Sequence, residues 1–134
     1  DTVLPNDREI SNESQKPVDV TTFYNGATIT GRDGDGITVM VTFIAKPTSA
    51  AATYIESWVD ITGGTGTPVN LANLYKGIFS FPKGTGVERP INYTFTGYTL
   101  DTWETNGGVV KIRSNGPVEI YDVNYVITRN HKAR

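Results

Sequence analysis

Residues 116–134 read GPVEIYDVNYVITRNHKAR, and this stretch decides the fold. Its alternation is that of a half-buried β-strand, in which every second side chain points to the same face. One face would carry Tyr121, Val123, Tyr125 and Ile127. The opposite face would carry Val118, Ile120 and Val126. In a strand with one solvent-exposed face, these positions should be polar. The stretch therefore predicts a strand with surplus apolar side chains on its second face.

Similar strands precede it along the chain. From residue 18 onward, short segments rich in Val, Ile, Thr, Tyr and Phe alternate with clusters of Gly, Pro and Asp. We predict about eight strands, over residues 18–24, 27–30, 37–45, 53–61, 71–81, 91–103, 109–113 and 118–129. Asn-Gly pairs at residues 25–26, 106–107 and 115–116 favour tight hairpin turns between antiparallel strands. The expected fold is all-β, a two-sheet antiparallel jelly-roll sandwich.

The length of 134 residues fits one domain with its own core. Residues 1–17 are polar and contain two prolines, so we predict a polar N-terminal arm or linker there. The jelly-roll domain is then expected over residues 18–134. Acidic residues outnumber basic ones by seven to three up to Gly36, and no Lys/Arg stripe follows, which argues against a nucleic-acid partner.

The residue types for common chemistries are scarce. The chain has no Cys and a single histidine, His131, so we predict no metal site, no cofactor and no catalytic residues. The carboxylates Asp101 and Glu104 beside Trp103 do not form a persuasive glycosidase pair, and the protein is predicted not to be an enzyme. No apolar run is long enough for a membrane-spanning segment.

The loop GRDGDG, residues 31–36, carries two carboxylates that resemble part of a calcium loop. The remaining ligands of such a loop are missing, so a tight hairpin connection is favoured, although whether an ion binds there stays open. A solvent-facing loop could instead contact a receptor. The predicted receptor-contact residues are Arg32, Asp33, Asp35, Lys83 and Arg89.

Two explanations compete for the surplus apolar residues. Some outward-facing hydrophobic side chains are normal, and a bulge can shift the register midway along a long strand. Alternatively, the outer face of one sheet packs against further copies of the chain, which burial of apolar area would stabilise. The predicted oligomer-interface residues are Met40, Tyr54, Trp58, Tyr98, Val118, Ile120 and Val126.

Residues 98–132, YTLDTWETNGGVVKIRSNGPVEIYDVNYVITRNHK, carry a polar NGG turn, an apolar strand, an SNGP turn and a long last strand. This pattern resembles the closing strands of the trimeric, tumour-necrosis-factor-like jelly-roll head domains of bacteriophage tail needles and tail fibres. The resemblance implies a non-catalytic virion protein in the phage tail, a homotrimer that contacts a host cell-surface receptor or envelope component. It also implies that Val118, Ile120 and Val126 face a neighbouring subunit.

Two other functions remain open at this point. A capsid decoration (cement) protein would use the arm to bind between shell subunits. A bacterial carbohydrate-binding module would be a monomeric sandwich with exposed aromatic residues. The mass in solution separates this last function from the other two.

Overall fold

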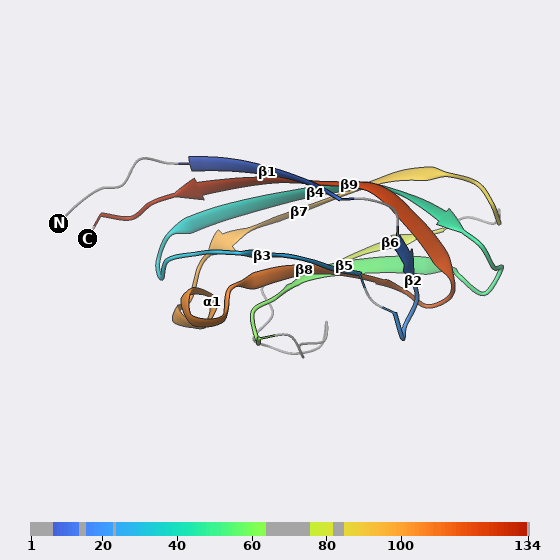
Figure 1. Cartoon of the computed structure of the whole chain (residues 1–134), viewed down its shortest axis with the longest axis horizontal. Helices are drawn as coiled ribbons and strands as arrows, with labels where there is room; N and C mark the ends of the chain where they lie inside the picture. Colours follow the sequence, from blue (N-terminus) through green and yellow to red (C-terminus); the bar gives the residue numbers. More distant parts are fainter. Residues whose placement is uncertain (1–6, 14–15, 23, 64–75, 82–84, 134) are drawn as a thin grey trace.

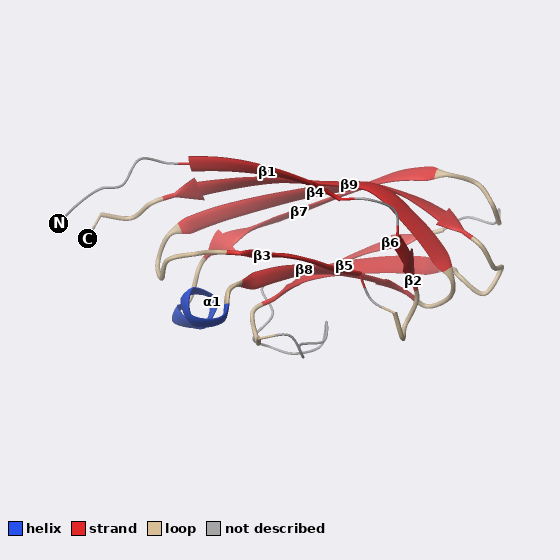
Figure 2. Cartoon of the chain, in the orientation of Figure 1, coloured by secondary structure: helices blue, strands red, loops and turns tan. Residues whose placement is uncertain are grey.

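The structure is a computed structural model that describes residues 7–13, 16–22, 24–63, 76–81 and 85–133. It confirms the predicted all-β sandwich of two antiparallel sheets, which form two layers in Figure 1. Sheet A contains β1 (Asp7–Glu13), β2 (Lys16–Val18), β4 (Gly36–Pro47), β7 (Arg89–Tyr98) and β9 (Val118–Asn130). Sheet B contains β3 (Tyr24–Ile29), β5 (Tyr54–Asp60), β6 (Lys76–Ser80) and β8 (Gly108–Ser114). A short helix, α1 (Asp101–Asn106), lies at one end of the sandwich (Figure 2).

The strand order gives the sandwich its jelly-roll character. Sheet A runs β1-β9-β4-β7, with β2 also paired to β9, and sheet B runs β3-β8-β5-β6. Most consecutive strands therefore lie in opposite sheets, and the chain repeatedly crosses from one layer to the other. The Asn115-Gly116 pair consequently links β8 to β9 across the sandwich, so the predicted hairpin turn there is wrong. Pairing between strands of the same sheet is long-range, and no local turn signal reports it.

The structure of the last strand, β9, explains why both of its predicted faces carry apolar residues. Asp122 adopts a positive φ of 54°, and the register between β4 and β9 shifts between Thr42 and Ile44. One extra residue in β9 reverses the alternation there, as a β-bulge does. Side chains on both sides of the bulge therefore face the same core, and the fully buried ones are Val118, Ile120, Val123, Tyr125 and Ile127. The prediction that Val118 and Ile120 face a neighbouring subunit is wrong, because they lie inside this subunit.

Several predicted boundaries change in the structure. The turn predicted at Asn25-Gly26 is wrong, because both residues lie within β3. The strand expected over residues 91–103 ends at Tyr98, and α1 follows. Within α1 the buried indole of Trp103 donates a hydrogen bond of 2.9 Å to the carbonyl of Ile29, so tertiary contact rather than strand propensity determines this turn. Gly107 ends the helix with φ at 78°. Of the strand expected over residues 71–81, β6 forms the second half and residues 71–75 lie outside the described part.

Part of the predicted N-terminal arm pairs with the domain. β1 runs antiparallel to β9, with Asp7 opposite Arg129 and Glu13 opposite Val123, and forms one edge of sheet A. Its polar sequence did not indicate a strand, but the backbone hydrogen bonds of an edge strand do not require apolar side chains on both faces. The other edge of sheet A is β7.

The core fills the space between the sheets. From β4 it takes alternate residues, namely Ile37, Val39, Val41, Phe43 and Ala45. Tyr24 of β3 and Tyr125 of β9 meet across the layers through their hydroxyl groups. Opposite the core, each sheet presents an outer face, and these outer faces hold the candidate sites.

Candidate functional site

The outer face of sheet A carries a strip of uncharged side chains. We define the outer strip as Thr38, Met40, Thr42, Thr94, Thr96, Val126 and Thr128 on β4, β7 and β9. Met40 lies opposite Thr94 on one side and Val126 on the other, and its side chain is 36% exposed. None of these seven residues is charged, whereas exposed sheet faces usually alternate with Lys, Arg, Glu or Asp. The outer strip is therefore an unusual solvent-facing surface.

Charged groups lie at the ends of this face. At the Pro47 end of β4, Lys46 and Glu119 form an ion pair of 3.9 Å. At the Gly36 end, Lys132 follows the last residue of β9. The uncharged centre of the face is suited to burial against another surface. The charged ends are suited to polar ligands.

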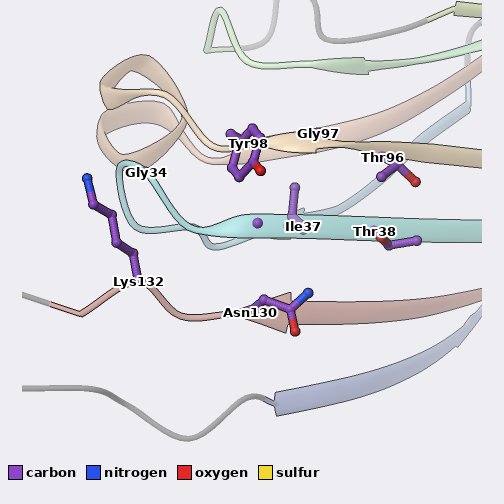
Figure 3. A pocket seen from close by; sticks show the side chains of 9 residues that line it. Gly34, Ile37, Thr38, Thr96, Gly97, Tyr98, Asn130 and Lys132 are labelled. Atoms are coloured by element: carbon purple, nitrogen blue, oxygen red, sulfur yellow. The ribbon is translucent and has the colours of Figure 1, made fainter.

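A groove of about 570 Å³ lies at the Gly36 end of the same face (Figure 3). We call it the terminal groove; its lining residues are Gly34, Gly36, Ile37, Thr38, Thr96, Gly97, Tyr98, Asn130 and Lys132. Figure 3 shows Tyr98 and Asn130 on either side of the strand that carries Ile37, with Thr38 and Thr96 farther along the strands and Lys132 toward the Gly34 end. Tyr98 is 73% exposed, the most exposed large hydrophobic side chain among the described residues. Gly34 and Gly36 bring no side chain to the groove.

A buried carboxylate anchors the loop beside the terminal groove. Asp35 is 2% exposed and accepts hydrogen bonds from Arg32 at 3.1 and 3.2 Å and from the backbone N–H of Lys132 at 2.7 Å. Its Oδ2 also lies 2.6 Å from Nδ1 of His131. Burial raises the pKa of Asp35, but hydrogen bonds from His131, Lys132 and Arg32 outweigh it and lower the pKa to about 2. These contacts tie the 31–36 loop to the end of β9.

The predicted receptor-contact residues do not gather at one place. Asp35 is buried, so its carboxylate is not available to a receptor, and the loop crosses between sheets instead of forming the predicted hairpin. Asp33 is exposed, and its backbone N–H donates to Glu104 at 2.6 Å. Arg89 lies opposite Ala45, at the far end of β7 from the loop. Lys83 is outside the described residues.

The predicted interface residues divide among three surroundings. Met40, Tyr98 and Val126 lie on the outer face of sheet A, where Val126 is half-buried. Tyr54 and Trp58 belong to β5 in sheet B. Trp58 is fully buried outside the core, with the guanidinium of Arg113 5.4 Å from its ring centroid. Burial in the single chain removes Trp58 from the interface, as it does Val118 and Ile120.

An ionic cluster that was not predicted from the sequence lies on the outer side of sheet B. Lys111 contacts Asp60 at 2.7 Å with both side chains almost fully buried, and Arg113 contacts Glu56 at 2.5 Å. Burial raises the pKa of Asp60, but hydrogen bonds from Lys111 and Thr62 lower it overall. The alternation of Glu56, Trp58 and Asp60 was the available signal, since charged residues on a buried strand need partners. These ion pairs account for the burial of charged side chains and do not indicate a site for catalysis or binding.

No protein-family model matches the chain, and no curated protein is significantly similar to it. Among the described residues, no group of three or more His, Asp or Glu side chains is arranged to hold a metal ion. No helix in the described part of the chain is both long and apolar enough to span a bilayer. The functional interpretation therefore depends on the two features of sheet A, the outer strip and the terminal groove.

Proposed function

We propose that the chain is a non-catalytic bacteriophage structural protein, a trimeric knob of a tail needle or tail fibre that contacts the host envelope. The observation that carries the proposal is the outer strip, an uncharged sheet face with Met40 and Val126 side by side. The jelly-roll sandwich is also the architecture that the resemblance of residues 98–132 implies.

The composition of the outer strip suits a subunit contact. Interface cores are depleted of charge and enriched in Met, and the cost of removing hydroxyl groups from water is low when Thr side chains can bond across the contact. Apolar area buried there would contribute about 25 cal/mol per Å². A Lys or Glu at any position of the outer strip would oppose burial of this face, and no position of the strip carries one.

The size of the face is also close to what a subunit contact needs. Strands β1, β9, β4 and β7 contain 7, 13, 12 and 10 residues, which at about 4.8 Å between strands and about 3.3 Å per residue make a face of roughly 670 Å². Stable interfaces bury roughly 800 Å² on each partner. One sheet face of this chain therefore approaches the area that a specific association between copies needs.

The test is the mass in solution. Sedimentation of the wild-type chain is expected to give three times the mass of one chain. The double substitution Met40→Lys with Val126→Lys places two charges on the outer strip and should give single chains. The matched control is Ile78→Lys, which changes an exposed residue of sheet B and should leave the trimer intact.

A wild-type mass of one chain would contradict the knob and favour a monomeric binding module. A trimer that survives both lysines on the outer strip would place the contact on another surface. Mixing with empty capsids, followed by protease protection of the N-terminal segment, separates the knob from a capsid decoration protein.

A further inference from the structure

The terminal groove has features of a ligand site beyond the centre of the outer strip. We propose that it binds an acidic saccharide, with one sugar ring against Tyr98 and a carboxylate directed toward Lys132. The inference rests on the proposed function only for the biological role of the ligand, a glycan of the host surface. Binding itself requires only the groove in one chain.

The floor of the groove is backbone. Gly36 lies opposite Tyr98 on β7 and opposite Asn130 on β9, and Gly97 lies opposite Ile37. Ile37 points into the core, so between the side chains of Tyr98 and Asn130 the sheet surface is bare at Gly36. A flat ring can approach the strands there more closely than at any position that carries a side chain.

Tyr98 provides an apolar plane beside that floor. Sugar rings have an apolar face of C–H groups and a rim of hydroxyl groups, and they match a phenol ring that is apolar in its body and polar at its tip. A ring that is 73% exposed does not contribute to the core, so the fold does not account for its position. Unlike the buried tyrosines, Tyr98 has no aromatic partner among the described residues.

Polar groups lie within the same groove. Thr38 and Thr96 face each other across β4 and β7, and Asn130 ends β9. These three side chains have no hydrogen bond to other described residues, so their donors and acceptors are directed to solvent or a ligand. Hydroxyl and amide groups of this kind can bond to sugar hydroxyl groups in both senses.

The charge of the groove favours an anion. Its lining contains one cation, Lys132, and no carboxylate. The backbone of Lys132 is fixed by its hydrogen bond to Asp35, and its side-chain stem lies over Gly34, where an added Cβ would be 3.2 Å from Cδ of Lys132. The neighbouring charge of Asp35 is already bonded by Arg32, His131 and Lys132, so it is partly neutralised. A sugar carboxylate is the simplest partner that satisfies both Tyr98 and Lys132.

The groove shares Thr38 and Thr96 with the outer strip, but Tyr98, Asn130 and Lys132 lie beyond the strip. The groove uses the Gly36 end of β4, whereas Met40 and Val126 lie farther along the sheet. The two proposals therefore make separable predictions for separate variants.

The experiment measures binding of the whole chain to a panel of uronic-acid oligosaccharides and their neutral hexose counterparts. Glucuronate tetramers and cellotetraose, for example, differ in the carboxylate alone. At least one acidic member should bind with a Kd between about 10 µM and 1 mM, at least tenfold more tightly than its neutral counterpart. Tyr98→Ala should weaken that binding at least tenfold. Lys132→Ala should remove the preference for the acidic member, and Lys132→Arg should restore it.

Tyr54→Ala is the matched control. It removes an exposed tyrosine of the other sheet, sheet B, and should leave binding unchanged. Unchanged melting temperatures show that the variants fold. Binding by no acidic saccharide at millimolar concentration, or binding that Tyr98→Ala leaves intact, would overturn the inference. Equal binding of acidic and neutral members would overturn the role of Lys132. The variant with Met40→Lys and Val126→Lys should still bind, which separates this result from the failure of the proposed trimer.

Discussion

Oδ2 of Asp35 lies 2.6 Å from Nδ1 of His131, although the two residues are 96 positions apart in the chain. The contact joins the loop between β3 and β4 to the end of β9, and Asp35 also holds the backbone of Lys132, which lines the terminal groove. Because Asp35 is buried, its ionised form depends on these partners.

Asp35→Asn should lower the free energy of unfolding at pH 7 by about 2 kcal/mol, because hydrogen bonds to a charged group contribute about 1.5–3 kcal/mol. The pKa of Asp35 is depressed from 3.8 to about 2, so its contribution is complete above pH 4 and is lost as the pH falls toward 2. Urea unfolding from pH 7 to pH 2 should therefore show the two proteins converging in acid. Asp101→Asn, at an exposed helix position, should change the free energy by less than about 0.5 kcal/mol. A constant difference across the pH range would exclude ionisation as the cause.

The bulge in β9 depends on the positive φ of Asp122. Asp122→Val should destabilise the fold by about 1–2 kcal/mol, because a β-branched residue is strained in the left-handed region. Asp122→Gly should be neutral or slightly stabilising. Chemical unfolding of both variants measures the difference, with Thr128→Val as an outward-facing control on the same strand. Equal effects of Val and Gly at position 122 would mean that the bulge does not require this conformation.

The fully buried Ile120 distinguishes a residue of the subunit core from one at an interface. Ile120→Ala should lower the free energy of unfolding by about 2–5 kcal/mol, as other large-to-small core substitutions do. Val126→Ala, on the half-buried outer face, should cost less than half as much. Ile120→Ala should be measured in dilute solution, in a chain that also carries Met40→Lys and Val126→Lys. Association then does not contribute to the free energy of unfolding. A small effect of Ile120→Ala in that chain would mean that Ile120 contributes at a subunit interface and not in the core.

The buried ion pair of Lys111 and Asp60 should be costly to break from one side. Lys111→Met leaves the Asp60 carboxylate buried with fewer partners and should cost about 3–5 kcal/mol. Lys46→Met, which removes the partly exposed pair with Glu119, should cost at most about 1 kcal/mol. Thermal unfolding at pH 7 compares the two. Similar costs would indicate that burial does not decide the strength of these pairs.

Alternation along single strands was enough to predict much of the core. Apolar residues alternate along β4 and β7, and Val39, Val41 and Phe95 of this pattern are buried, because period-two patterns persist where no bulge interrupts them. The same reasoning misplaced Val118 and Ile120, because one extra residue at Asp122 exchanges the faces and leaves no compositional signal.

The candidate site was less predictable than the core. Tyr98 and Met40 were identified as surplus outward residues, and both lie on the outer face of sheet A. Trp58 has the same alternation but is buried beside Arg113, since exposure depends on what covers a face and not on the strand itself. The terminal groove combines β4, β7 and β9, which are adjacent only after the sheet has formed.

The sequence by itself determined the all-β class, the position of most strands and the buried face of strands without a bulge, because side-chain alternation acts locally. Only the tertiary structure decided the strand order, the burial of Asp35 beside His131 and the conversion of an apparent two-faced strand into a one-faced one. Those features arise from pairing between segments distant in the chain, where a single shift of register changes which side chains meet.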